Sequence, residues 1–192
     1  MILWDEFVST FDVKGELIHI IQCRVARISV GPSTVRGRGN TGVAKAARAY
    51  LRSIDLSRFG TTDECEFQTA LNEETEALRR AFPEGARRWG LARKVLNIFL
   101  RDCAYTIYLA KEFNLSLAED YFEIPLDSIT AKELRKTKSG RTLPRWLGVI
   151  HLHPRLSQQY QSAARKEAKM QGVSRMHLDA LWWSFSRDND ED

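Results

Sequence analysis

The 192-residue chain lacks several features that would place a protein quickly in a class. No run of 18 or more apolar residues occurs, so the sequence predicts no membrane span and no membrane partner. The N-terminus carries Asp5 and Glu6 where a secretory signal peptide needs basic residues. We therefore expect a cytoplasmic protein.

Cysteine is scarce, and its spacing excludes the usual cysteine-based sites. Cys23, Cys65 and Cys103 are odd in number and far apart, which fits neither a disulfide framework nor a zinc or iron–sulfur cluster. Three buried thiols in a reducing compartment are expected instead. His151 and His153 have no carboxylate close in sequence, so they predict a surface turn rather than a metal site. We expect no metal and no cofactor.

What is present is the composition of an ordinary globular domain. With 43% hydrophobic residues the chain can bury a normal core, and its length suits one domain. Helical spacing and stop signals predict a mainly α protein, while residues 17–30 fit a strand or a short helix equally well. The predicted helices are 43–54, 64–81, 91–112, about 128–136, about 157–171 and about 173–186.

The expected organisation is a single helical domain over residues 1–187, followed by an acidic tail at 188–192. Within the domain we expect an N-terminal lobe over about 1–80, a central segment over about 81–136 and C-terminal helices over about 141–187. We also expect a monomer.

Positive charge is concentrated in three blocks. The formal net charge of +4 conceals +7 over residues 24–58, +6 over 79–101 and +5 over 131–148. The compensating acid gathers at 61–76 and in the tail. Such segregation indicates either a face built for a polyanion or solvated helix faces. Binding of nucleic acid through such a face would depend on salt.

The Gly- and Arg-rich segment 31–42 leaves two interpretations open. Four glycines and one proline predict a turn or a surface loop. Arg36 and Arg38 among those glycines could instead approach a phosphate. The Gly-Lys-Ser/Thr ending of a nucleotide-binding P-loop is missing, which excludes that motif.

The segment 91–112 is the most informative part of the sequence. Apolar residues cover most of its circumference, which predicts a helix buried at the centre of the domain. A single polar stripe remains, at steps of three or four residues, and buried charge on it needs a cleft or partners. The stripe consists of Lys94, Asn97, Arg101, Tyr105 and Tyr108.

Lys94 is the candidate nucleophile of this stripe. A helix that begins near residue 91 puts Lys94 in its first turn, where the helix dipole disfavours the ammonium form. Burial acts in the same direction. A neutral lysine can attack a carbon and form a Schiff base.

Two segments together resemble the helix–hairpin–helix DNA glycosylase superfamily. Gly90-Leu91-Ala92-Arg93-Lys94-Val95-Leu96-Asn97 is similar to its hairpin, whose usual form is Gly-Val-Gly-Arg-Lys-Thr-Ala-Asn before an apolar helix. Downstream, Ile124-Pro125-Leu126-Asp127-Ser128 is similar to the Val-Asp-Thr segment that carries the essential aspartate. The motif-level resemblance covers about residues 85–130.

The resemblance implies a fold and an activity. The fold would be helical, with the active-site cleft between two lobes. Lys94 would be the nucleophilic lysine, which marks the bifunctional members that also cleave the strand. Asp127 would assist base departure and stabilise positive charge on the sugar. The partner would be double-stranded DNA with a flipped base, which implies association with the nucleoid.

The sequence departs from the family pattern at two places. Ala92 replaces the second hairpin glycine and leaves less room for a close backbone approach. Lys94 and Asp127 are 33 positions apart (127 − 94), more than in compact endonuclease III-like members. That spacing resembles the archaeal 8-oxoguanine glycosylase branch, to which the segment 177–183 is also similar. The resemblance does not identify which base is excised.

The same resemblance nominates residues for DNA and for the base. Gly90 and the amides after it would hold a phosphate at the helix N-terminus. The expected DNA-binding residues are Arg87, Arg88, Trp89, Gly90, Ala92 and Arg93. The substrate pocket is expected to include Asn97, Arg101 and Tyr105. A flipped base also needs apolar or aromatic neighbours, although core packing is the commoner role for each candidate. These candidates are Trp89, Tyr105, Tyr108, Trp146, Trp182 and Trp183.

Other functions compete with this one. A catalytically silent DNA-binding module could use the same hairpin without bringing Lys94 and Asp127 together. A separation above about 8 Å between the Lys94 amine and the Asp127 carboxylate would favour that module. A helical ribonuclease that pairs an arginine with a nearby histidine is disfavoured, because residues 101–111 contain no histidine. A small-molecule enzyme is disfavoured by the missing nucleotide loop and metal cluster.

Overall fold

The computed structural model describes residues 12–31, 34–35 and 42–188, and within them it contains helices and no strand. The main helices are α2 (Val13–Ser29), α3 (Val43–Leu51), α4 (Glu64–Ala81), α5 (Trp89–Tyr105), α6 (Ile107–Glu112), α7 (Ser128–Lys136), α8 (Pro154–Gln171) and α9 (His177–Asp188). Short 3₁₀ helices occupy Leu56–Phe59, Glu84–Ala86, Leu115–Tyr121 and Val149–His151. The predicted mainly α class is confirmed. No helix of the described part has the length and apolar character to cross a membrane.

Local capping explains why some predicted boundaries agree closely with the structure. The Asp63 carboxylate accepts hydrogen bonds from the amides of Cys65 and Glu66, at 2.7 and 3.1 Å, and so begins α4. Phe82 is extended before Pro83 and ends that helix. The pattern left residues 17–30 undecided. Residues 17–29 belong to helix α2, which the Asp12 carboxylate caps, and Val30 follows its end.

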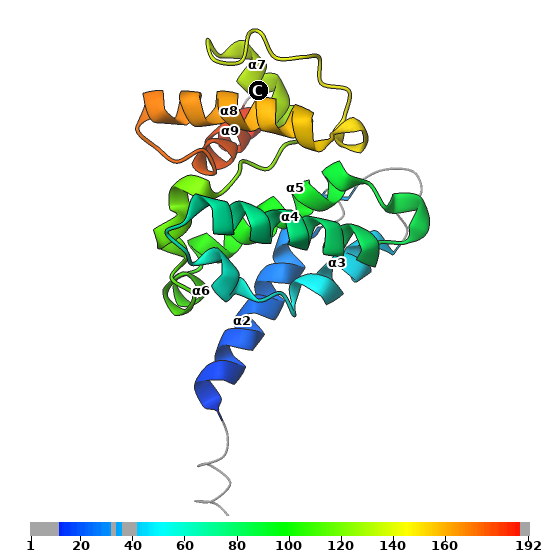
Figure 1. Cartoon of the computed structure of the whole chain (residues 1–192), viewed down its shortest axis with the longest axis vertical. Coiled ribbons are helices and arrows are strands. Elements are labelled where there is room, and N and C mark those ends of the chain that lie inside the picture. The colour runs from blue at the N-terminus through cyan, green and yellow to red at the C-terminus, as the bar shows by residue number, and fades with distance from the viewer. Residues whose placement is uncertain (1–11, 32–33, 36–41, 189–192) are drawn as a thin grey trace, which may run out of the picture.

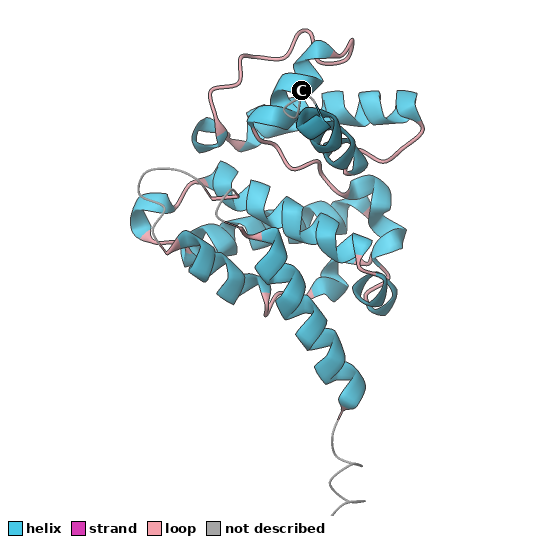
Figure 2. Ribbon diagram, turned by 180° about the vertical axis from the view of Figure 1, so that it is seen from behind, coloured by secondary structure: helices cyan, strands magenta, loops and turns pink. Residues whose placement is uncertain are grey.

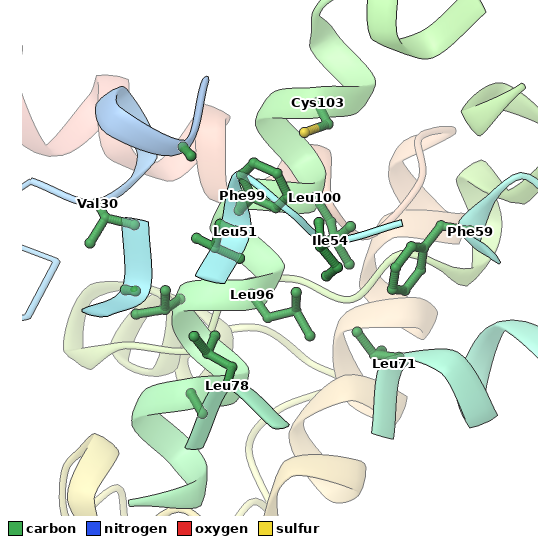
Figure 3. Close-up of a cluster of buried hydrophobic side chains, with 14 of the residues drawn as sticks. Val30, Leu51, Ile54, Phe59, Leu71, Leu78, Leu96, Phe99, Leu100 and Cys103 are labelled. Atoms are coloured by element: carbon green, nitrogen blue, oxygen red, sulfur yellow. The ribbon is translucent and has the colours of Figure 1, made fainter. Parts of the chain in front are cut away.

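Two hydrophobic cores divide the molecule. The first is built around α5, whose Leu96, Phe99, Leu100 and Cys103 meet side chains from the surrounding helices (Figure 3). The second lies among α7, α8 and α9, and Figures 1 and 2 show these three helices as a separate lobe. The chain passes from the first core to the second at Glu123. The predicted central segment 81–136 therefore spans both cores.

The predicted helix 91–112 is in fact two helices. Thr106 is extended, with φ −94° and ψ 105°, and it separates α5 from α6. Ile107 and Tyr108 are each 60% exposed and only Leu109 of α6 is buried, so the prediction of a helix buried all round is wrong for α6. Tyr108 lies on α6, beyond the extended Thr106, and therefore does not continue the polar stripe of α5.

The thiols differ in their environments. Cys103 is buried in the first core, whereas Cys23 is partly buried and Cys65 is exposed. The prediction of three buried thiols is therefore wrong for two of them. Burial, followed by the nearby Asp102 carboxylate, raises the pKa of Cys103 well above its ordinary value, which makes this thiol a poor nucleophile.

Two sequence features fall largely beyond the described structure. Arg36 and Arg38, which carry the phosphate interpretation of segment 31–42, lie outside the described residues. The same holds for residues 189–192 of the acidic tail. Both expectations therefore remain predictions from the sequence.

Candidate active site

Lys94 and Asp127 meet where the two cores face each other. The Lys94 Nζ lies 3.5 Å from the Asp127 Oδ2, and their side chains are only 12% and 17% exposed. Lys94 belongs to α5 of the first core, and Asp127 immediately precedes α7 of the second. Two residues that are distant in sequence thus form one partly buried ion pair.

Asp127 is held rigidly by the start of α7. Its Oδ1 accepts hydrogen bonds from the amides of Ile129 and Thr130, at 2.9 and 3.0 Å. The Asp127 amide donates to the Thr130 hydroxyl at 2.8 Å, which completes a capping box. One carboxylate oxygen therefore anchors the helix, while the other faces Lys94.

A second acid approaches the same place from α9. Asp179 is 4% exposed and forms an ion pair with Arg101. Arg101 lies on α5, two helical turns after Lys94. Arg101 also binds Asp102, whose Oδ2 accepts a 2.6 Å hydrogen bond from the Ser29 hydroxyl. Arg101 was expected in a substrate pocket, but its guanidinium is already engaged by two carboxylates.

Burial makes Asp179 an unusual carboxyl group. Desolvation raises the pKa of Asp179 from 3.8 to about 7 against the opposing attraction of Arg101. The Asp127 carboxylate raises the pKa of Asp179 further, and the Lys94 ammonium lowers it. Asp179 therefore feels the charges of both residues of the pair and can change its protonation state near neutral pH.

Arg93 and Asn97 are almost fully buried, and both are hydrogen-bonded to other groups of the protein. Arg93 is 5% exposed and binds Glu123, with 2.9 Å between its Nε and a carboxylate oxygen. Its other donors reach the Leu71 carbonyl, Thr75 and Asn72. The Asn97 amide, 3% exposed, also donates to Glu123, at 3.1 Å. Direct substrate or DNA contact by Arg93 and Asn97 is therefore not supported.

Tyr105 lies at the outer end of the stripe. It is 48% exposed, its ring stacks on His177 at 5.6 Å, and its hydroxyl lies 2.9 Å from the His177 Nδ1. His177 in turn contacts Glu119 at 3.0 Å. Of the residues expected in the pocket, Tyr105 alone presents a large accessible surface.

The segment expected to bind DNA is only partly exposed. Arg87 and Arg88 are exposed and Trp89 is partly buried, but Gly90 is buried and Ala92 is fully buried. Gly90 packs directly under the 149–152 segment, where a Cβ would overlap the Val149 carbonyl oxygen and lie 2.6 Å from the Leu152 Cβ. The glycine serves helix packing here, so DNA contact by the Gly90 and Ala92 side of the helix is not supported.

The start of α5 also changes the electrostatic argument for Lys94. The helix begins at Trp89, so Lys94 is its sixth residue and lies in the second turn. The helix dipole acts mainly within the first turn. The expected dipole contribution at Lys94 is therefore weak, and the contact with Asp127 is the main electrostatic feature of this lysine.

The aromatic candidates mostly have packing roles. Trp146 meets Tyr160 edge-on at 5.5 Å, and Trp146 and Trp182 pack against the second core. Trp89 also packs there, and the Arg93 guanidinium lies 5.2 Å from its ring centre. The side chain of Trp183 lies outside the described part.

A polar cavity of about 520 Å³ opens beside Trp89 between α4 and α8. Arg93, Glu123 and Arg155 are among the residues that line it, whereas Lys94 and Asp127 are not. The cavity is therefore distinct from the ion pair. Its Ser157 hydroxyl is buried and has no hydrogen-bond partner within the described structure.

Sequence reasoning missed two acids that organise the site. The Glu123 carboxylate accepts hydrogen bonds from both Arg93 and Asn97. The sequence signal for its role was a lone carboxylate within the apolar run Tyr121–Leu126. Asp179 lies in segment 177–183, and the family resemblance of that segment gave it no role. Its position on the buried face of a C-terminal amphipathic helix was the available signal.

His151 and His153 lie on the surface before α8. Both are exposed, and the His153 Nδ1 accepts the Leu156 amide at 3.4 Å as the helix cap. Among the described residues, no group of three or more metal-ligating side chains comes together.

Comparison with known proteins gives no match at any level. No family model, no curated protein and no solved structure shows significant similarity to this chain.

Proposed function

We propose that this protein is a DNA glycosylase with associated AP-lyase activity, in which Lys94 attacks the sugar and Asp127 assists. The observation that carries the proposal is the 3.5 Å contact between the Lys94 amine and the Asp127 carboxylate. This separation is far below the roughly 8 Å above which the catalytically silent module would be favoured. The resemblance of the hairpin and aspartate segments supports the same assignment.

The chemistry needs a neutral amine next to a carboxylate. The Asp127 Oδ2 is placed to accept a proton from Lys94, and contacts of this kind commonly tighten when substrate binds. The Lys94 Nζ lone pair then forms a bond to the sugar C1′ as the bond from C1′ to the base breaks. The electron pair of that bond leaves with the base, which takes the proton from Asp127 and so restores the Asp127 carboxylate.

The second half-reaction follows from the covalent adduct. The secondary ammonium formed at C1′ first loses a proton, and the nitrogen lone pair then opens the sugar ring to give a protonated Schiff base, while the ring oxygen takes up a proton. Loss of a C2′ proton then expels the 3′ phosphate and cleaves the strand. The Asp127 carboxylate stabilises the positive charge that develops on the sugar.

The rigid cap of α7 suits this role for Asp127. Its Oδ1 is committed to two backbone amides, so only Oδ2 faces the reacting centre. A preorganised carboxylate loses little energy to reorientation in the transition state. The partly buried setting strengthens the electrostatic effect.

Borohydride trapping tests the proposal directly. The full chain is incubated with duplex and single-stranded oligonucleotides that carry different damaged or modified bases, with and without borohydride. We expect a covalent protein–DNA adduct on at least one duplex, because borohydride reduces the Schiff base to a stable amine. Lys94→Gln removes the nucleophile and should abolish the adduct.

A matched substitution separates the nucleophile from general charge loss. Lys111 is exposed on α6, and Lys111→Gln removes the same charge without approaching Asp127. This control should trap DNA as the unmodified protein does. An adduct that survives Lys94→Gln would refute the assignment of the nucleophile. Binding to duplex DNA without excision or trapping on the whole panel would favour the silent module.

A further inference from the structure

A groove lies along the outer side of α8, away from the ion pair. It has a volume of about 480 Å³ and is walled by α8 and the loop that follows α7. Arg155 and Lys166 supply its charged side chains, and no carboxylate lines it. The remaining polar lining consists of the hydroxyls of Ser139, Thr142 and Ser162 and the amides of Gln158 and Gln159.

The cations of this groove are not neutralised by the protein. Arg155 and Lys166 are both exposed, and within the described residues neither forms an ion pair. By contrast, Arg58, Arg93 and Arg101 are all paired with carboxylates. Hydroxyl and amide donors next to unpaired cations suit phosphate oxygens.

The spacing of the cations indicates an extended ligand. Arg155 and Lys166 are eleven residues apart on one helix, which corresponds to about 16 Å along its axis. One phosphate cannot contact both side chains over that span. An anion with several phosphates in a row satisfies both.

The groove also continues toward the segment that begins α5. Arg155, Gln158 and Ser162 line both this groove and the cavity beside Trp89. Exposed Arg88 directly precedes Trp89 in the chain. A polyanion that contacts Arg88 at the N-terminus of α5 would therefore extend into the groove along α8.

We infer that the α8 groove binds the phosphodiester backbone of DNA outside the site of base excision. The inference rests on the proposed function only for the choice of DNA as the polyanion. Arg155 and Lys166 contact separate phosphates, and the hydroxyls and amides between them orient the strand. The groove adds affinity and register, and it carries no base-specific contact.

The salt dependence of binding tests this inference. Affinity of the full chain for an undamaged duplex is measured by fluorescence anisotropy over a range of sodium chloride concentrations. The double variant Arg155→Gln/Lys166→Gln should reduce the magnitude of the slope of log K against log salt by about 1.8, roughly 0.9 for each lost phosphate contact. The control Lys14→Gln/Lys111→Gln removes the same charge from α2 and α6, in the other lobe and outside the three basic blocks, and should leave the slope unchanged.

The outcomes separate this inference from the proposed function. If both double variants keep the unmodified slope, or change it equally, the groove does not bind the DNA backbone. If borohydride trapping succeeds while the α8 variant keeps its slope, this inference fails alone. If no adduct forms on any oligonucleotide but the α8 slope falls as stated, the proposed chemistry fails and the groove assignment stands.

Discussion

Asp179 should make the stability of this protein depend on pH in a way opposite to an ordinary ion-paired carboxylate. Burial raises the pKa of Asp179 from 3.8 to about 7 in the folded protein, whereas the unfolded chain leaves it near 3.8. Between these values the folded state holds a proton that the unfolded state has lost. The contribution is therefore complete below about pH 4 and disappears as pH rises toward about 7.

The size of the effect follows from the shift. One pH unit of pKa difference corresponds to about 1.4 kcal/mol, so a rise from 3.8 to about 7 represents about 4 kcal/mol of unfolding free energy. Asp179→Asn removes the titration and keeps a neutral side chain of similar shape. The stability of this variant relative to the unmodified protein should rise by about 4 kcal/mol between pH 4 and pH 8.

Urea denaturation at several pH values measures this difference. Glu16→Gln removes an exposed carboxyl group from α2 and is the matched control for the loss of one acidic side chain. The comparison between variants cancels the titration of the groups that do not interact with Asp179. If the relative stability of Asp179→Asn is flat or falls as pH rises, the Arg101 guanidinium outweighs burial at this site, and the reasoning is refuted.

Two further predictions concern the backbone around the candidate site. Gly90→Ala should destabilise the protein by about 1–3 kcal/mol, because its Cβ would overlap the Val149 carbonyl oxygen. Gly85→Ala, which meets nothing within 4 Å, should stay within about 0.5 kcal/mol; equal melting temperatures for the two variants would contradict this packing. Asp127→Ala should cost about 1 kcal/mol through the lost helix cap, whereas Asp127→Asn keeps the acceptor and should cost only a few tenths. Both Asp127 variants should lose trapping with borohydride, so a stable and fully active Asp127→Asn protein would remove this carboxylate from the mechanism.

The sequence predicted those helices whose ends are set by neighbouring residues, such as a capping side chain or a proline. Asp63 and Phe82-Pro83 mark the ends of α4, and Asp127 begins α7. The break at Thr106 carries no proline or glycine, and only the tertiary setting of the two flanking helices selects it. The spacing of apolar residues alone therefore predicted one helix where the structure has α5 and α6.

The candidate site shows the same division between local and tertiary information. Lys94 and Asp127 were identified from motif resemblance, and their proximity is a property of the fold. The direction of neighbouring side chains was not predictable, because adjacent helical positions point about 100° apart and their partners lie elsewhere in the chain. Arg93, expected to bind DNA, and Asn97, expected in the substrate pocket, both bind Glu123 instead.

The ion pair depends on how the two cores are joined, since no helix connects its two members. Asp127 is fixed to the second core by its cap, and Lys94 is fixed to the first by α5. The Arg101–Asp179 ion pair joins α5 to α9 close to this point. When Asp179 is protonated, its electrostatic attraction to Arg101 weakens, and the constraint between the two cores weakens with it. Because the Asp127 carboxylate raises the pKa of Asp179 and the Lys94 ammonium lowers it, the charges of the pair are coupled to a group that titrates near neutral pH.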